Sequence, residues 1–168
     1  MSRIIVLSVF ALLFSVPSFA QDTTTAPRAV SLELPETDDG LAGAGPIRRY
    51  GWFKKLWKIR RTAFATDAKD KKGAVVFLGD SITQGWSDDF HGDFGDLVVA
   101  NRGISGDTTR GMLIRLQADV LSLDPSAVVM LMGTNDLEEK AEPETIADNV
   151  ELIIAALKKH NPGMPIER

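Results

Sequence analysis

Three short, uninterrupted apolar runs, each ending abruptly in a cluster of glycine and polar residues, constrain the fold of this 168-residue chain most. The runs cover residues 74–78, 97–100 and 127–132. Continuous apolar runs of this length are typical of strands buried on both faces. Apolar residues recur at helical spacing over residues 108–121 and from Pro143 onward, with Asp107 as an expected N-cap of the first of these helices. This alternation predicts an α/β fold, a parallel sheet with helices on both faces.

The polar clusters that follow the three runs carry the chemical information. They occupy residues 79–81, 101–106 and 133–136. The carboxyl ends of parallel strands meet at one edge of the sheet, and ligands bind beyond that edge. The clusters together supply a hydroxyl, side-chain amides and glycine-flanked backbone N–H groups. Acyl transfer needs such a set, because it requires a nucleophilic oxygen and donors for the oxyanion that develops on the attacked carbonyl.

Composition excludes several other kinds of protein. The chain has no cysteine, so disulfides, a thiol nucleophile and thiolate metal sites are ruled out. Two histidines are too few for a histidine-rich metal site, and we expect no metal and no cofactor. A formal net charge of −4 without a long Lys/Arg tract argues against nucleic acid as the main partner.

The first 20 residues have the pattern of a secretory signal peptide. Arg3 precedes an apolar run over residues 4–14, and a polar break leads to Ser18-Phe19-Ala20, where we expect cleavage. The alternative is a membrane anchor, but the apolar run is much shorter than the roughly 20 residues of a spanning helix. The sequence therefore predicts a secreted or periplasmic protein with no integral membrane span after cleavage.

Residues 21–49 are rich in Thr, Pro, Gly and acidic residues, and we interpret them as an exposed linker or loosely docked arm. Residues 50–168 then form the only folded domain. It opens with an amphipathic pattern over residues 52–69, in which tryptophans alternate with cations. This pattern permits a membrane-surface or nucleic-acid helix, but we favour a helix that packs its aromatic stripe on the sheet.

Three sequence blocks resemble the SGNH (GDSL-like) hydrolases. They are Gly-Asp-Ser-Ile-Thr at 79–83, Asn-Arg-Gly-Ile-Ser-Gly-Asp-Thr-Thr at 101–109 and Gly-Thr-Asn-Asp at 133–136. They occur in the family's order, each at the end of an expected strand, and the likeness extends over about residues 50–166. It is greatest to the branch that contains the catalytic subunits of platelet-activating factor acetylhydrolase. The resemblance implies a flavodoxin-like three-layer fold.

The resemblance also implies roles for individual residues. Ser81 is the expected nucleophile, and its own N–H is one expected oxyanion donor. Gly103 is expected to supply a second donor through its backbone N–H, and Asn135 a third through its side-chain amide. Asp80 is expected to hold the turn by hydrogen bonding. The implied reaction is hydrolysis of small acyl or acetyl esters, of carbohydrate or lipid, through an acyl-enzyme on serine.

Each motif taken alone has a simpler interpretation. Gly-Asp-Ser after a strand is a common turn, Asn135 could be only a cap, and Gly103 and Gly106 could mark only a loop with special backbone angles. The glycine-rich turn at residues 103–109 could also bind an anion. However, this turn has neither the Lys-Ser/Thr pair nor the GxGxxG spacing of phosphate-binding loops.

The catalytic base is harder to identify. The family completes its site with a late Asp-x-x-His block, and no such block follows Asn135 here. We expect His160 to be a solvated cation at the end of a helix. His91 lies in a loop ten residues after Ser81 and matches no family position.

The late strands of the family are also missing, which predicts a sheet incomplete at the C-terminus with an unpaired edge on its third strand. Two function classes stay open. One is a truncated secreted esterase impaired by loss of the late block, and the other is a non-catalytic binding module that retains the oxyanion rim. The sequence does not indicate an oligomeric state.

Overall fold

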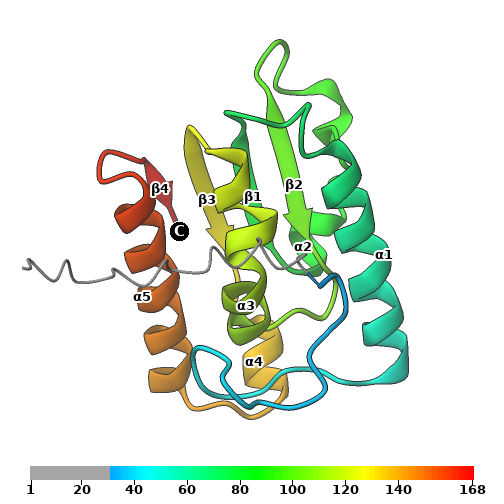
Figure 1. Ribbon diagram of the computed structural model, residues 1–168, viewed down its shortest axis with the longest axis vertical. Coiled ribbons are helices and arrows are strands. Elements are labelled where there is room, and N and C mark those ends of the chain that lie inside the picture. Colours follow the sequence, from blue (N-terminus) through cyan, green and yellow to red (C-terminus); the bar gives the residue numbers. More distant parts are fainter. Residues whose placement is uncertain (1–30) are drawn as a thin grey trace, which may run out of the picture.

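A parallel β-sheet forms the centre of the molecule, as the sequence predicts. The computed structural model describes residues 31–168, so the expected signal peptide and residues 21–30 of the expected linker lie outside the described residues. The four strands have the order β2-β1-β3-β4, and all three strand pairs are parallel (Figure 1). The strands are β1 (Val75–Gly79), β2 (Val99–Gly103), β3 (Ala127–Leu131) and β4 (Ile166–Glu167).

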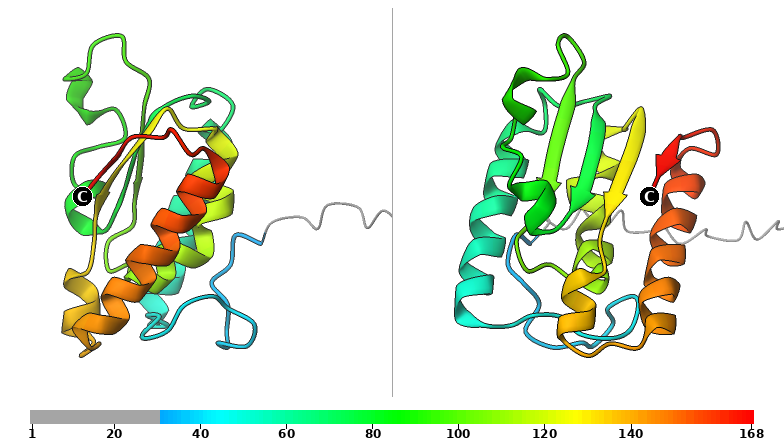
Figure 2. Two further views of the ribbon diagram at one scale, coloured as in Figure 1. Left: turned by 90° about the vertical axis from the view of Figure 1, so that its left-hand side faces the viewer. Right: turned by 180° about the vertical axis from the view of Figure 1, so that it is seen from behind.

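Helices connect the strands and flank the sheet unequally. They are α1 (Gly51–Asp67), α2 (Ser81–Gln84), α3 (Thr109–Asp119), α4 (Thr134–Glu138) and α5 (Pro143–His160), with 3-10 turns η1 (Phe90–Gly92) and η2 (Leu121–Leu123). Figure 2, left, shows the sheet nearly edge on, with the three long helices α1, α3 and α5 on one side. The segment that carries α2 and η1 lies on the other side. Helices therefore lie on both faces, as expected, and the second face carries only short ones.

Side chains alternate between the two faces of the sheet, and one face is covered more completely than the other. The side chains of Val76, Leu78, Val128 and Met130 are buried in the main core. Residues of α3 and α5 complete this core: Met112, Leu116, Ile153 and Leu157. The intervening strand residues point to the opposite face, and Leu131 there is 48% exposed. Burial of apolar surface thus stabilises one face of the sheet more than the other.

α1 packs into the protein, as the favoured interpretation of its aromatic pattern predicts. Phe53, Trp57 and Phe64 are buried in a second apolar cluster with Leu34 and Ile104. The cations on the inner side of the helix are paired within the fold, and among described residues no helix is both long and apolar enough to cross a membrane.

The second strand starts later and continues further than its apolar run indicates. Leu97 and Val98 are 51% and 44% exposed, and the strand begins at Val99. It runs through the polar Asn101 and Arg102, both buried. Pairing with β1 continues to Gly103, so the position in the sheet outweighs the polarity of these residues.

Two further local expectations are corrected. Thr108, not Asp107, is the N-cap of α3, and its side chain accepts a hydrogen bond from the Gly111 N–H. The edge of β3 is not left wholly unpaired, because Ile166 and Glu167 of β4 pair with Val128 and Val129. β4 is too short to cover the rest of β3.

Residues 31–49 contain no helix or strand, yet they are held closely against the domain. Leu34 is buried, and Asn149 of α5 both donates to the Ala44 carbonyl at 2.9 Å and accepts from the Ala44 N–H at 3.1 Å. Asp38 pairs with Arg110 of α3 at 2.7 Å. The described part of this segment is thus an arm with specific anchors, whereas its composition predicts loose docking.

Candidate active site

The three polar clusters meet at the carboxyl edge of the sheet, where the sequence places them. The Ser105 N–H donates to Gln84 Oε1 at 2.6 Å, which joins the loop after β2 to α2. Asn135 Nδ2 donates to the Asp107 carbonyl at 2.8 Å and approaches Asp80 Oδ2 at 3.4 Å. Side chains after β1 and β3 and backbone groups after β2 therefore form one connected rim.

Ser81 lies at the start of α2, directly beyond β1, and is exposed. The preceding Asp80 is buried, and its Oδ1 accepts a hydrogen bond from the Ile82 N–H at 3.0 Å. This contact is the N-cap that stabilises a strand-to-helix turn. It agrees with the expectation that Asp80 holds the turn, which leaves the Ser81 hydroxyl open to solvent.

Asn135 lies in α4 and is 8% exposed. Its Oδ1 accepts a hydrogen bond from Arg48 Nη1 at 3.1 Å, and its Nδ2 donates to the Asp107 carbonyl. The second N–H of the same amide faces Asp80 Oδ2 at 3.4 Å, which is long for a hydrogen bond. That N–H is therefore underused and could donate to a stronger acceptor.

Gly103 does not take the position that the sequence predicts for an oxyanion donor. Its N–H already donates to Asn101 Oδ1 at 2.9 Å in a buried environment. A Cβ at this position would lie 2.3 Å from the Gln84 nitrogen and 2.9 Å from the Asp80 carbonyl oxygen. Glycine is needed here because the backbone of α2 packs directly on the end of β2.

Gly106 is the rim glycine that the sequence interpretation did not select. It has φ +87°, and none of the hydrogen bonds within residues 31–168 uses its N–H. Its neighbours Ser105 and Asp107 are tied to α2 and to Asn135. A sequence signal was available, because Gly106 lies between the polar Ser105 and Asp107 just before a helix, whereas Gly103 precedes the apolar Ile104.

Two buried carboxylates, those of Asp107 and Asp136, hold the loop after β2 in place. Burial raises the pKa of Asp107 to about 6, although Arg115 opposes this with an ion pair of 2.8 Å. Arg115 also donates to the Arg102 carbonyl at 2.8 Å, so it connects the Asp107 side chain to the end of β2. Burial likewise raises the pKa of Asp136, and hydrogen bonds from the Thr109 hydroxyl and N–H oppose the shift. These contacts hold the loop after β2 in place.

Neither histidine of the sequence contacts Ser81 among the described hydrogen bonds and ion pairs. His160 pairs with Asp124 at 3.2 Å, just before β3, at the opposite edge of the sheet from the rim. His160 is thus the last residue of α5, as expected, but it contacts Asp124 as well as solvent. His91 is exposed and has φ +58°.

An Asp-x-x-His spacing does occur once in the sequence, at Asp88 and His91, only ten residues after Ser81. In the structure Asp88 pairs with Arg60 at 2.9 Å. The His91 backbone N–H donates to Asp89 instead, at 3.1 Å. The spacing therefore does not correspond to a paired aspartate and histidine.

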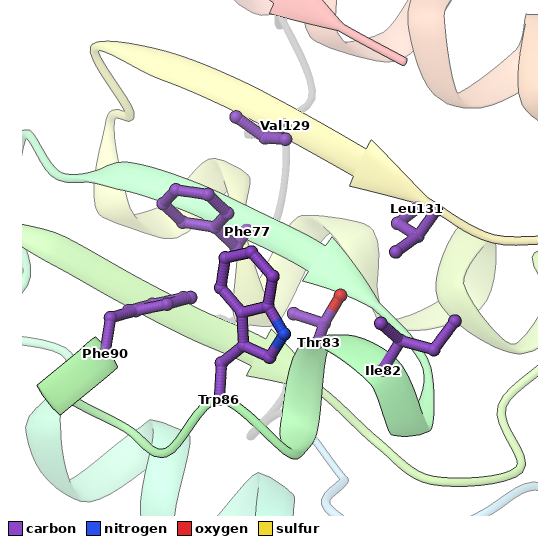
Figure 3. A pocket seen from close by; sticks show the side chains of 7 residues that line it. All are labelled: Phe77, Ile82, Thr83, Trp86, Phe90, Val129 and Leu131. Carbon is purple, nitrogen blue, oxygen red and sulfur yellow. The ribbon is translucent and has the colours of Figure 1, made fainter. Parts of the chain in front are cut away.

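A small apolar pocket of about 100 Å³ opens beside α2 on the less covered face of the sheet (Figure 3). The side chains of Ile82 and Thr83 reach it from α2, and those of Val129 and Leu131 from β3. Three aromatic side chains, Phe77, Trp86 and Phe90, complete the lining. The pocket adjoins the helix that begins with Ser81. Within residues 31–168, no three His, Asp or Glu side chains converge as metal ligands would.

Comparison with known proteins identifies the family of the chain. Residues 77–167 match the model of the GDSL-like lipase/acylhydrolase family. The alpha2 subunit of platelet-activating factor acetylhydrolase IB from Homo sapiens is 34% identical over 113 residues, which are 66% of this chain and 48% of that protein. The alpha1 subunit from Rattus norvegicus is also 34% identical, over 63% of this chain and 46% of that protein.

Solved structures agree with the fold. A GDSL-like lipase from Bacteroides thetaiotaomicron is 29% identical, with a TM-score of 0.54 over 63% of this chain and 55% of that one. An acylhydrolase structure from Bacteroides fragilis gives 27% identity and a TM-score of 0.55, over 62% of this chain and 54% of that one. The chain spans about half the length of the curated relatives it matches. Since the family model matches more than half of the chain, and the rim described above carries its sequence blocks, this chain belongs to the GDSL-like lipase/acylhydrolase family.

Proposed function

We propose that this chain carries the nucleophile and the oxyanion-binding part of a serine esterase that hydrolyses small acyl esters. The observation that carries the proposal is the exposed Ser81 on a capped turn beyond β1, beside a rim whose loops are joined through Asn135. Acyl transfer requires an exposed hydroxyl as the nucleophile and hydrogen-bond donors that converge on the oxygen of the attacked carbonyl.

In this mechanism Ser81 Oγ attacks the carbonyl carbon of the ester, and its proton passes to a base. The carbonyl oxygen becomes an oxyanion, for which the Ser81 N–H, the Gly106 N–H and Asn135 Nδ2 are the proposed donors. Collapse of the tetrahedral intermediate expels the alcohol and leaves an acyl-serine. Water then attacks the acyl-serine, which releases the acid and restores the hydroxyl. No cofactor takes part in the proposed steps.

The pocket beside α2 supports a small acyl group. Its lining is almost entirely apolar and its volume is about 100 Å³, a size that suits a short aliphatic chain. We therefore propose acetyl and similarly short esters of small alcohols, carbohydrates or lipids as the substrate class. The rate should fall along the series of p-nitrophenyl acetate, butyrate and octanoate.

Hydrolysis of p-nitrophenyl acetate by the full chain tests the proposal. Ser81→Ala should abolish the enzyme-dependent rate, and Ser87→Ala, which removes a hydroxyl from the loop that follows α2, should leave it unchanged. Because neither histidine contacts Ser81, we expect a slow rate, on the order of 10³–10⁴-fold over water, as in triad-deficient serine hydrolases. Free imidazole added as an external base should accelerate wild type more than Ser81→Ala. Equal rates for both proteins, with and without imidazole, would refute the proposal.

No hydrogen bond or ion pair within residues 31–168 joins His91 or His160 to Ser81, which favours a second candidate, a module that binds short esters at the rim without hydrolysing them. This candidate predicts saturable binding of a non-hydrolysed acetamide analogue in calorimetry, together with no Ser81-dependent turnover in the imidazole assay. Turnover that depends on Ser81 excludes it.

We also propose that residues 1–20 direct export and are removed after Ala20. Expression of the full chain in a bacterial host should yield a periplasmic product whose N-terminus is Gln21. Ala20→Arg should block processing and retain the longer form, whereas Gln21→Ser should still be processed. A product that keeps Met1 in the wild type contradicts this part of the proposal.

A further inference from the structure

Arg48, from the arm that precedes α1, reaches the rim and is almost entirely enclosed there. The residue is 7% exposed although it belongs to a segment without helix or strand. Its guanidinium makes three contacts with α4 and its C-cap: Nη1 donates to Asn135 Oδ1 at 3.1 Å, Nη2 to Glu138 at 2.5 Å and Nε to the C-cap Glu139 at 2.7 Å. A planar guanidinium with several fixed donors is suited to holding acceptors in a defined geometry.

The partners of Asn135 fix the orientation of its amide. Arginine can only donate hydrogen bonds, so the atom that faces Arg48 has to be the amide oxygen. The Asp107 carbonyl can only accept, so the atom that faces it has to be Nδ2. Rotation of the amide by 180° would place two donors together on one side and two acceptors together on the other.

Arg48 also places a positive charge at the site. A Cβ built on Gly106 would lie 3.2 Å from Arg48 Nη1, so the guanidinium lies close to both Gly106 and Asn135. Desolvation works against the charge, but the carboxylates of Glu138 and Glu139 outweigh it and raise the pKa of Arg48. A hydrogen bond from a cation to the amide oxygen polarises the amide and strengthens its N–H groups as donors.

We infer that Arg48 is a positioning residue, which orients and polarises the Asn135 amide so that the N–H with only the long contact to Asp80 donates to the oxyanion. This inference rests on the proposed esterase function. The competing explanation is that Arg48 only anchors the arm. Arg49 provides the matched control, because it holds the same arm in shape through contacts within the arm, to Asp38 at 2.5 Å and to the Pro35 carbonyl at 2.9 Å, and has no hydrogen bond to Asn135 within residues 31–168.

The first measurement reads the amide directly and needs no catalysis. In ¹H–¹⁵N spectra of the full chain, the side-chain signals of Asn135 are identified by their loss in Asn135→Asp. Arg48→Met should shift these signals and accelerate their exchange with solvent about tenfold, and Arg48→Lys should give an intermediate effect. Arg49→Met should leave them in place. Unchanged Asn135 signals in a folded Arg48→Met protein would overturn the inference, whatever the catalytic activity.

The second measurement is a double-mutant cycle on the Ser81-dependent hydrolysis of p-nitrophenyl acetate. Arg48→Met should lower kcat about tenfold with little change in KM, because the lost interaction acts in the transition state. In an Asn135→Ala background the same substitution should change kcat less than about twofold. An equal loss in both backgrounds, or an equal loss in Arg49→Met, would show that Arg48 only anchors the arm. If Ser81-dependent hydrolysis is absent altogether, the esterase proposal fails while the spectra still decide the role of Arg48.

Discussion

The backbone N–H of Gly103 donates to Oδ1 of Asn101, two residues earlier in β2, at 2.9 Å. This contact uses up a donor that the sequence blocks point to as catalytic. It also shows what Gly103 does instead, since the backbone of α2 lies directly against it. The glycine allows the turn that carries Ser81 to sit on the end of the sheet.

Gly103→Ala should therefore destabilise the fold. The new Cβ would lie 2.3 Å from the Gln84 nitrogen and 2.9 Å from the Asp80 carbonyl oxygen, and backbone atoms cannot move aside as a flexible side chain can. We expect a loss of about 2–3 kcal/mol in the free energy of unfolding, measured by urea denaturation. Gly51→Ala, where nothing lies within 4 Å, is the control and should change stability by less than about 0.5 kcal/mol. Equal stability of the two variants would contradict this account of Gly103.

Hydrogen bonds from the side chain of Asn101 hold the segment between α2 and β2 in place. Its Nδ2 donates to the Thr83 and Ser87 carbonyls at 2.6 and 2.7 Å, and its Oδ1 accepts from Gly103. Asn101→Ala leaves these buried groups unpaired, so we expect a loss of about 2–4 kcal/mol and faster proteolysis within residues 85–98. Digestion with thermolysin, followed by mass spectrometry, locates the cleavage. Cleavage confined to other segments would argue that Asn101 does not hold this loop.

Arg61 of α1 and Asp119 of α3 form a buried ion pair, with side chains 5% and 4% exposed and a distance of 2.9 Å. Arg61→Met would leave Asp119 with only the more distant Arg115, at 3.7 Å. We expect a loss of about 3–5 kcal/mol. Lys72→Met, which breaks the exposed pair with Asp124, should cost about 0–1 kcal/mol. Urea denaturation of both variants at the same ionic strength makes the comparison, and similar losses would contradict it.

Because the pKa of Asp107 is raised in the folded chain, the contribution of this carboxyl to stability decreases as the pH rises. Between its usual pKa near 4 and about 6, the folded chain binds more protons at this group than the unfolded chain does. The contribution of this carboxyl to stability is therefore largest below pH 4 and is lost as the pH rises through 6.

Asp107→Asn removes this titration. The stability of the variant relative to the wild type should increase between pH 4.5 and 7, by an amount on the order of 2–3 kcal/mol. Urea denaturation at several pH values measures the difference. A difference that does not vary with pH would show that Asp107 stays ionised across this range.

Much of the fold was predictable from local patterns. The apolar runs before Gly79 and Gly133 predict β1 and β3 within a residue at each end, because both are inner strands of the sheet and are paired on both sides. Pro143 and the Asn-Pro-Gly stop predict the bounds of α5. β2 was harder to delimit, since the buried Asn101 and Arg102 look like loop residues until their partners in the fold are known.

The sequence by itself determined the α/β class, the parallel sheet, and the rim at which Ser81 and Asn135 meet the loop after β2. These features follow from the spacing of apolar residues and from the order of the apolar runs along the chain. Parallel pairing of the strands then brings the residues that follow each strand to the same edge of the sheet. The tertiary structure decided which rim glycine has a free N–H, because the Gly103 N–H donates to the buried Asn101 side chain, whereas no hydrogen bond within residues 31–168 uses the Gly106 N–H. It also decided the role of the arm, whose Arg48 contacts Asn135 across 87 residues, a separation that no local pattern reports.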